Sequence, residues 1–190
     1  MAGVDSWSRL ALEAGGGDAE SLKSLVEHAY EQVRRLCSSL VDEKSADDLA
    51  QETFVRVVRS LSSYQGRSSA RTWLLSIARH TCLDEIRARE RGRRRDRSLS
   101  SVAEGEEWGP DAGQKTVVMD LLRQLEPNRR TAFVLTQMLG LSYEDTAAVC
   151  ECPVGTIRSR VARARTDLVE ALELSDRVPD SPASQKSHLA

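Results

Sequence analysis

A chain of 190 residues suits one ordinary domain or two small ones, and its composition of 29% charged and 4% aromatic residues favours helices over a β-sandwich or barrel. The formal net charge of −2 excludes a uniformly basic protein that coats nucleic acid. No segment approaches the about 18 apolar residues of a spanning helix, and no basic flank precedes an apolar run at the start. We therefore expect no membrane insertion, no secretory signal and a cytoplasmic location.

Charge is distributed unevenly along the chain. Seven arginines and two acids lie within residues 87–97, and four arginines without an acid lie within 158–165. Residues 42–52 hold five acids and one lysine. Two basic segments and one acidic segment indicate separate partners, with nucleic acid at the basic ones.

The pattern along the chain predicts an all-α fold of two small helical domains joined by a flexible linker. Residues 1–18 contain a Gly15–Gly17 run and are predicted to be a flexible leader, with at most a weak helix near Trp7. Apolar periodicity then predicts a first domain at 19–91, with helices near 18–40, 45–60 and 70–91. The segment 92–114, first arginine-rich, then serine-rich, then acidic, is predicted to be a linker.

A second helical domain is predicted at 115–173, with helices near 116–125, 128–139, 142–150 and 153–172. Gly140 suits the end of a helix, and Ser142 with Asp145 three residues later has the spacing of a helix cap. Pro153 suits the start of the next helix. Two helices separated by so tight a turn are typical of a DNA-binding helix-turn-helix. Residues 174–190, with two prolines and several serines, are predicted to be a disordered tail.

The last predicted helix has two contrasting faces. Its apolar stripe comprises Val154, Ile157, Val161, Ala164, Leu168 and Leu172. Thr156, Ser159, Arg160 and Arg163 lie opposite, where arginine can bond guanine and hydroxyls can bond bases or phosphates. An ordinary solvated helix has similar faces, and the preceding cap and turn favour DNA binding instead.

The four cysteines do not suggest a metal site. Cys150 and Cys152 are separated by one residue, whereas paired zinc ligands usually have two to four residues between them and need a second ligand pair. We therefore expect reduced, buried thiols, no metal and no cofactor.

The 45–60 helix buries one stripe and leaves a mixed face on its other side. The stripe comprises Leu49, Ala50, Thr53, Phe54, Val57 and Leu61. The opposite face carries Asp48, Gln51, Glu52, Val55 and Arg59. Such a face is either solvated or a docking site for a basic partner helix.

The 70–91 helix is predicted to turn Trp73 towards the core and to carry Arg71, Arg79, His80, Asp84 and Arg87 outside. Such an arginine row can neutralise the phosphates of a DNA strand. The preceding loop, which includes Tyr64, Arg67, Ser68 and Ser69, has groups suited to stacking on and hydrogen bonding an extruded base.

Three runs together carry a family resemblance: ADDLAQETFVRVVRSL, YQGRSSARTWLLSIARHTCLDEIR and GLSYEDTAAVCECPVGTIRSRVARAR. In this order and spacing they resemble regions 2.2, 2.3–2.4 and 4.2 of the sigma-70 family, in its extracytoplasmic-function (group IV) branch. The wording is especially similar to an actinobacterial sigma-C-like subgroup.

The resemblance implies an alternative sigma factor, which is no enzyme and binds core RNA polymerase through the β′ clamp helices and the β flap. It implies polymerase docking by Asp48, Gln51, Glu52, Val55 and Arg59. It implies single-strand −10 recognition by Tyr64, Arg67, Ser68, Ser69, Arg71, Arg79, His80, Asp84 and Arg87. It implies duplex −35 recognition by Thr156, Arg158, Ser159, Arg160 and Arg163. An anti-sigma factor is a further expected partner.

Two positions depart from the family pattern. His80 stands where many relatives carry Asn, which puts the −10 base preference in doubt. Glu151 stands where relatives often carry Gly, and a positive φ at this residue would cost about 1–2 kcal/mol.

Two other functions remain open from the residues alone. A helix-turn-helix regulator could bind duplex DNA without polymerase, and it would not need the Asp48 and Glu52 face. A nucleic-acid enzyme or metal-responsive protein would need paired acids or Cys/His clusters, which the sequence does not offer.

Overall fold

The computed structural model describes the backbone of residues 5–99 and 117–176, and every element in these two ranges is helical. The all-α prediction is confirmed. The expected segments 100–114 of the linker and 177–190 of the tail lie outside the described residues. None of the helices in the two ranges combines the length and apolar character that crossing a bilayer requires.

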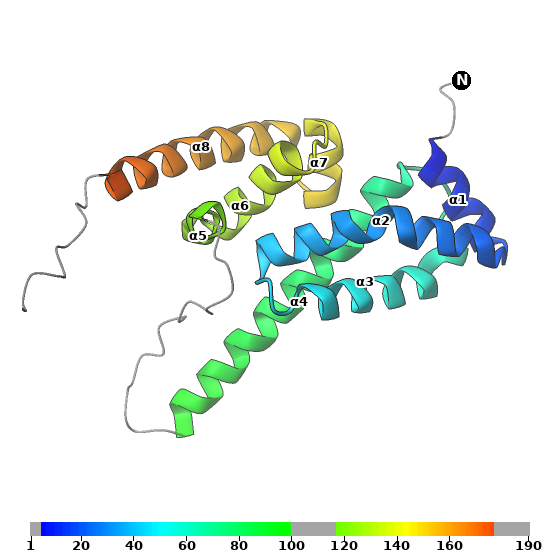
Figure 1. Cartoon of the computed structure of the whole chain (residues 1–190), viewed down its shortest axis with the longest axis horizontal. Helices are drawn as coiled ribbons and strands as arrows, with labels where there is room; N and C mark the ends of the chain where they lie inside the picture. The colour runs from blue at the N-terminus through cyan, green and yellow to red at the C-terminus, as the bar shows by residue number, and fades with distance from the viewer. Residues whose placement is uncertain (1–4, 100–116, 177–190) are drawn as a thin grey trace, which may run out of the picture.

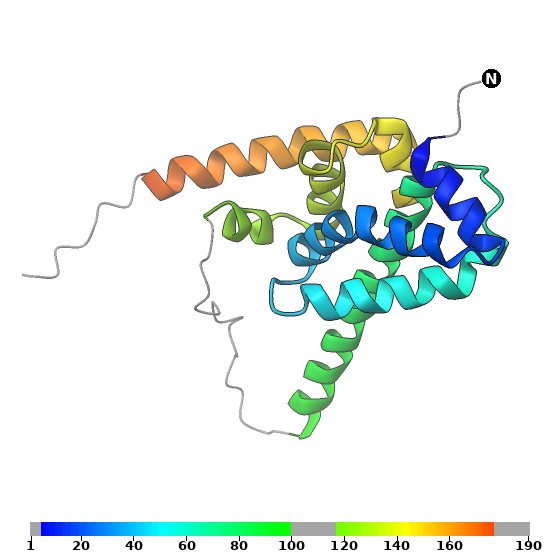
Figure 2. The same cartoon turned by 45° about the vertical axis from the view of Figure 1, so that its right-hand side comes forward.

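The N-terminal block, residues 5–99, contains α1 (Ser6–Gly15), α2 (Ala19–Leu40), α3 (Ala46–Ser60) and α4 (Ala70–Leu99). A short 3-10 turn, η1 (Leu61–Ser63), follows α3. Helices α2, α3 and α4 contact one another pairwise, and α1 packs on α2 and η1 (Figures 1 and 2). The whole predicted stripe of α3, from Leu49 to Leu61, is buried in this block, as its spacing indicated.

The expectation of a flexible leader is wrong for residues 5–18. Asp5 caps α1 by accepting hydrogen bonds from the Trp7 and Ser8 amides, each at 3.0 Å. Ala11 on this helix is fully buried. A side chain on Gly15 would bring its Cβ within 2.9 Å of the Leu61 carbonyl oxygen. Gly15 therefore permits close packing of α1 on η1. In the sequence the same glycine looked like a helix breaker.

Helix α4 is longer than expected and ends at Leu99 rather than near residue 91. It passes through Gly92, because arginine is a good helix former and no proline interrupts the segment. The expected linker at 92–114 thus begins as helix. The far end of α4 projects away from the other helices (Figure 1).

The C-terminal block, residues 117–176, contains α5 (Val117–Gln124), α6 (Pro127–Phe133), α7 (Tyr143–Cys150) and α8 (Val154–Asp176). The helix expected at 128–139 is divided, because its second half is a π turn, η2 (Val134–Met138). Helix α8 continues through residues 174–176, which were expected to belong to the tail. Leu172 was expected in the buried stripe of α8, and this prediction is wrong, since its side chain is 46% exposed.

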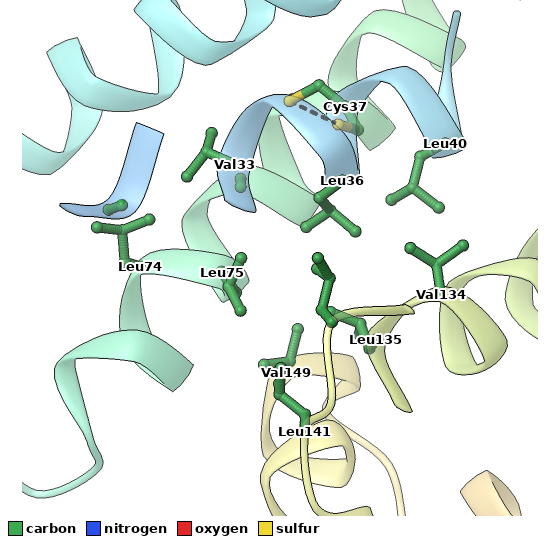
Figure 3. Close-up of a cluster of buried hydrophobic side chains, with 14 of the residues drawn as sticks. Val33, Leu36, Cys37, Leu40, Leu74, Leu75, Val134, Leu135, Leu141 and Val149 are labelled. Carbon is green, nitrogen blue, oxygen red and sulfur yellow. Dashed lines mark hydrogen bonds between the residues drawn. The ribbon is translucent and has the colours of Figure 1, made fainter. Parts of the chain in front are cut away.

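The two blocks share one buried apolar cluster. Figure 3 shows Leu36 of α2 and Leu75 of α4 facing Leu135 of η2 and Val149 of α7. All four side chains are fully buried. Burying apolar side chains is the main favourable term in folding, so these contacts hold the blocks against each other.

Candidate nucleic-acid interface

The predicted helix-turn-helix is present as α7, a three-residue turn and α8. Ser142 caps α7, with its hydroxyl accepting a hydrogen bond from the Asp145 amide at 2.9 Å. Gly140 before it has a φ of 68°. At the other end, the Cys152 amide donates to the Ala147 carbonyl at 3.1 Å. The cap and the tight turn are therefore confirmed.

Glu151 in this turn adopts the left-handed conformation, with φ 54° and ψ 44°. It is the only non-glycine residue with positive φ in the described part of the chain. The conformation costs about 1–2 kcal/mol for a residue with a Cβ. The family pattern, which often has Gly at this position, indicated this geometry correctly.

The outward face of α8 is open to solvent. Arg158, Ser159 and Arg163 are exposed, and Thr156 and Arg160 are half-buried. Ile157, Val161 and Ala164 on the opposite face are buried, so α8 is held by its apolar stripe. The helix is also braced by an ion pair between Arg129 of α6 and Asp167, 2.7 Å apart.

The cysteines are reduced in the structure. Cys37 of α2 and Cys82 of α4 are fully buried, with the Cys82 thiol donating to the Cys37 sulfur at 3.6 Å. That hydrogen bond, together with burial, raises the pKa of Cys82. Burial raises the pKa of Cys150 to about 11, against a smaller opposing effect of the Arg79 charge. No cluster of three or more Cys, His, Asp or Glu suited to a metal occurs among the described residues.

The mixed face of α3 is exposed along its length. Asp48, Gln51, Glu52, Val55 and Arg59 are all exposed on the side opposite the buried stripe. Val58 adjoins them and is 49% exposed, although the sequence reasoning did not include it. On a helical wheel, Val58 lies between Val57, which is buried, and Arg59, which belongs to the exposed face. This position could have identified Val58 as part of that face.

Tyr64 does not occupy the exposed position expected for a base-stacking residue. Its ring is 9% exposed and lies against the Trp73 ring, with centroids 4.9 Å apart. Its hydroxyl donates to the Ser68 carbonyl at 2.8 Å. In this structure Tyr64 holds the loop to the body, and its part in −10 recognition stays a prediction.

The rest of the loop before α4 is accessible. Arg67 and Ser68 are exposed, and Gly66 has a φ of 69°, which permits the turn. Ser69 begins α4 by accepting a hydrogen bond from the Thr72 amide at 3.1 Å. The expected core position of Trp73 is confirmed, since its half-buried ring packs on the apolar cluster.

Asp84 on α4 is paired with two arginines. One is Arg56 of α3, whose guanidinium lies 2.7 Å from the carboxylate, and the other is Arg87, at 3.6 Å. The hydrogen bond from Arg56 is the main reason that the pKa of Asp84 lies below its usual value. Asp84 is thus an ionised residue that positions Arg87, which is itself exposed.

The remaining α4 residues lie against the C-terminal block. Arg71 donates to the Leu139 carbonyl and, at 2.9 Å, to Gln32. The His80 ring nitrogen lies 3.5 Å from the Glu151 carboxylate. Thr72 donates to Asp145 at 3.0 Å. Sequence reasoning missed these contacts, because no local pattern signals a pairing between residues about 70 positions apart.

Comparison with known proteins places these surfaces in a family. Residues 25–92 match the model of sigma-70 region 2, and residues 115–168 match that of sigma-70 region 4. The probable RNA polymerase sigma-C factor of Mycobacterium bovis is 44% identical over 169 residues, covering 88% of this chain and 91% of the relative. The ECF RNA polymerase sigma-E factor of Escherichia coli K12 is 33% identical, covering 78% and 85%.

Solved structures agree with these sequence relatives. CnrH, in complex with the cytosolic domain of CnrY, has a TM-score of 0.70 at 26% identity, covering 90% of this chain and 99% of that one. The Bartonella quintana sigma factor RpoE, in complex with the anti-sigma factor NepR, has a TM-score of 0.67 at 29% identity, covering 82% and 99%.

The chain is an all-α protein with an open helix-turn-helix and a second helix that carries several arginines. The matched regions and relatives show that the chain belongs to the sigma-70 family, in its extracytoplasmic-function branch. It is an alternative sigma factor that directs transcription initiation. The rival interpretation, a helix-turn-helix regulator that acts without polymerase, is not favoured.

Proposed function

We propose that three surfaces of this sigma factor have separate roles in transcription initiation. The exposed face of α3 binds the β′ clamp helices of core RNA polymerase. Helix α4 and the loop before it read the −10 element as a single strand. The outward face of α8 reads the −35 element as duplex. The observation that carries the proposal is that the predicted faces of α3 and α8 are exposed in the same structure, with Asp48 and Glu52 open on α3 and Arg163 open on α8.

The α3 face suits a basic partner helix. Asp48 and Glu52 offer negative charge one helical turn apart, and Val55 adds an apolar centre that is 43% exposed. Glu52 also bonds Arg56 at 3.0 Å, which fixes its direction. Gln51 and Arg59 extend the face at both sides. Such a patch, apolar at its centre and charged at its rim, matches the ordinary anatomy of a protein interface.

The α8 face suits a DNA major groove. The major groove admits an α-helix, and arginine bonds guanine through two hydrogen bonds there. Arg158 and Arg163 are exposed, and Ser159 is exposed between them. Arg160 is half-buried beside the Cys152 sulfur, 3.5 Å away, so it suits a phosphate contact at the edge of the face.

The −10 surface combines a loop with a basic helix. Arg67 and Ser68 in the loop are accessible to an unstacked base, while Tyr64 shapes the loop from below. Arg71, Arg79, His80 and Arg87 follow on α4 for the backbone phosphates. Removing a base from the stack costs a few kcal/mol, which contacts of this kind and those of the polymerase offset.

A groove at the outer end of the C-terminal block suits the polymerase β flap. It is lined by Leu121 and Leu125 of α5 and its end, and by Ala171 and Leu174 of α8. Leu174 is 63% exposed, and the rest of the lining is polar or charged, with Gln124, Glu126, Arg129, Asp167 and Glu170. An exposed apolar side chain with polar groups around it often marks a protein interaction site.

The proposed work is binding and positioning, which requires neither a catalytic residue nor a cofactor of this chain. The chain would act in the cytoplasm, where polymerase and promoter DNA are found. An anti-sigma factor is a further proposed partner, supported by the Bartonella quintana relative, whose structure contains one.

The proposal is tested by adding the purified chain to core polymerase and a range of promoters. We expect specific transcripts. The double variant Asp48→Lys/Glu52→Lys should lower affinity for core polymerase at least ~10-fold, because it reverses two negative charges of the docking face.

The matched control is Glu20→Lys/Glu27→Lys, which makes the same charge change at exposed positions of α2. It should bind polymerase as the wild type does. Duplex DNA binding without polymerase binding or any transcript would contradict the proposal and support a regulator that acts without polymerase. Equal polymerase binding by both double variants would contradict the assignment of the docking face to α3.

A further inference from the structure

Helix α1 lies beside the loop that precedes α4, and one of its serines contacts that loop. The loop, residues 64–69, is the segment proposed to receive an unstacked base of the −10 strand. Helix α1 packs on η1, which leads into the loop, and on α4, which follows it (Figures 1 and 2). Ser8 of α1 is only 6% exposed, and its hydroxyl lies within hydrogen-bond distance of groups at both ends of the loop.

The Ser8 hydroxyl has three hydrogen-bond partners. It donates to the Asp5 carboxylate at 2.7 Å. Its oxygen accepts from the Ala70 amide at 2.9 Å, and the Tyr64 hydroxyl lies 3.2 Å away as a second donor. Both of these latter contacts are buried. Ser8 thus connects α1 to the first residue of the loop and to the first residue of α4.

Asp5 fixes the direction of the Ser8 hydroxyl. Burial acts to raise the pKa of Asp5, but the hydrogen bonds from the Ser8 hydroxyl and from the Ser8 and Trp7 amides outweigh it and hold the pKa below its usual value. Asp5 is therefore ionised at neutral pH and can only accept, so it takes the single proton of the Ser8 hydroxyl. The lone pairs of the Ser8 oxygen are then left for Tyr64 and Ala70.

Tyr64 closes the loop at its base. Its hydroxyl lies 2.8 Å from the Ser68 carbonyl oxygen and 3.2 Å from the Ser8 oxygen, so its one proton has two acceptors. Its ring packs against Trp73 of α4. Removing the Ser8 oxygen would therefore free one side of the group that joins the two ends of the loop.

Ala70 begins α4, where the amides of the first turn have no partner within the helix. Its side chain is fully buried, and the Ser8 oxygen supplies the partner that its buried amide needs. Ser69, one residue before, accepts from the Thr72 amide. The start of α4 is thus held from two sides, while residues 65–68 of the loop remain exposed.

We propose that Ser8, oriented by Asp5, is a positioning residue for −10 recognition. Its hydroxyl fixes both ends of the loop, so that residues 65–68 present one conformation to the unstacked base. Ser8 is buried and acts through the loop, without touching DNA. A loop that is already held in its binding conformation loses less conformational freedom when a ligand binds. The inference rests on the proposed −10 role of the loop and extends that role to α1.

Two variants disturb this network, and a third is a matched control. Ser8→Ala removes the hydroxyl and leaves the Ala70 amide without its partner. Asp5→Asn keeps a good cap for α1 but places an amide donor where the carboxylate accepts the Ser8 proton. The control is Ser21→Ala, at a serine that is 7% exposed and whose hydroxyl links α1 to α2 through Glu13 at 2.8 Å.

The first measurement is hydrogen exchange of the full free chain. Ser8→Ala should speed exchange of the amides of residues 64–70 at least about fivefold, with Asp5→Asn between it and the wild type and Ser21→Ala within about twofold of the wild type. If Ser8→Ala loses helicity by circular dichroism, Asp5→Asn decides the result, because it keeps the cap. Unchanged loop exchange, or equal increases in Ser8→Ala and Ser21→Ala, would overturn the inference. This result depends on neither polymerase nor DNA.

The second measurement is binding of the holoenzyme to a labelled DNA single strand. The probe is the non-template strand of the promoter that gives the strongest transcript, with abasic sites placed one at a time across the −10 element. The wild type should lose about tenfold in affinity at one position, where the base is received by the loop. Ser8→Ala should lose less than about threefold at that position, and Ser21→Ala should behave as the wild type.

The ratio of affinities for the intact and abasic strands separates positioning from general weakening. A variant that is only less stable binds both strands less well and leaves the ratio unchanged, so an unchanged ratio in Ser8→Ala would overturn the positioning role. A wild type without any abasic-sensitive position would contradict the −10 role of the loop, and the inference with it. Failure of the proposed function as a whole is seen separately, as the absence of transcripts with core polymerase.

Discussion

The two helices proposed to read DNA differ in what surrounds them. The reading face of α8 points to solvent, because its apolar stripe alone packs on α5, α6 and α7. Helix α4 is amphipathic as well, but α7 packs on it. The outward polar face of a helix is therefore accessible only when no other segment of the chain packs on it.

The two helices also differ in the ion pairs that their arginines form. On α4, Asp84 pairs with Arg56 and Arg87. Within the described ranges, neither Arg158 nor Arg163 of α8 has an ion pair. The arginines of α8 therefore have fewer competing contacts to break before they bind DNA, whereas those of α4 exchange one partner for another.

The strongest expected effect concerns the buried cluster that holds the C-terminal block on α4. Leu135→Ala should lower the free energy of unfolding by about 3 kcal/mol, because Leu135 is fully buried in the cluster shared by both blocks. Chemical denaturation followed by circular dichroism measures this. Leu172→Ala, at an exposed leucine of α8, is the control, and equal losses in the two variants would contradict the shared core.

Substituting an arginine on the open face tests the α8 side of the comparison. Arg163→Ala should weaken binding to −35 duplex about 10-fold, within the roughly 1–3 kcal/mol that a base contact supplies. Arg165→Ala is the matched control, since Arg165 is also exposed but lies outside the proposed DNA-binding set and donates to Gln137 at 2.8 Å. Fluorescence anisotropy at constant salt measures both. A uniform loss across all duplex sequences would assign Arg163 to a phosphate instead.

A smaller effect is expected at the start of α7. Ser142→Ala should destabilise the chain by about 1 kcal/mol, because the α7 amide of Asp145 loses its capping hydroxyl. Ser142→Thr keeps the hydroxyl and should restore most of the stability. Thermal unfolding measures the pair, and equal melting of Ser142→Ala and wild type would show that packing on α4, and not the cap, holds α7.

The smallest expected effect is on stability at acid pH, through the ion pair between Asp42 and Arg89 of α4. Burial acts to raise the pKa of Asp42, but the hydrogen bonds from Arg89 of α4 and from Ser45 outweigh it and hold the pKa below its usual value. A carboxylate with a lowered pKa stabilises the fold above its unfolded value of about 4, and this stabilisation is lost as pH falls through the folded value.

The loss in acid should be below about 1 kcal/mol, since Arg89 remains partly solvated. Asp42→Asn should lower stability at neutral pH and flatten the dependence of unfolding free energy on pH below about 5. Asp48→Asn, at an exposed acid of α3, is the control. A pH profile unchanged by Asp42→Asn would show that other carboxylates govern the acid response.

Much of the fold and part of the candidate site could be predicted from local patterns. The buried stripe of α3, the Ser142 cap and the left-handed Glu151 all depend on residues within a few positions of one another. Errors occurred where a local pattern had two meanings. The glycines at 15–17 permit close packing as well as flexibility, and the arginines after residue 91 form helix as readily as they fill a linker.

The helices, the helix-turn-helix and the exposed faces of α3 and α8 could be predicted from the amino-acid sequence alone, because helical period, caps and turns act over short separations. The burial of Tyr64 against Trp73 and the packing of α7 on α4 follow from the folded arrangement instead. The contacts responsible, such as Thr72 to Asp145, join residues far apart in the chain. They form because two apolar surfaces meet and exclude water, which no local spacing records.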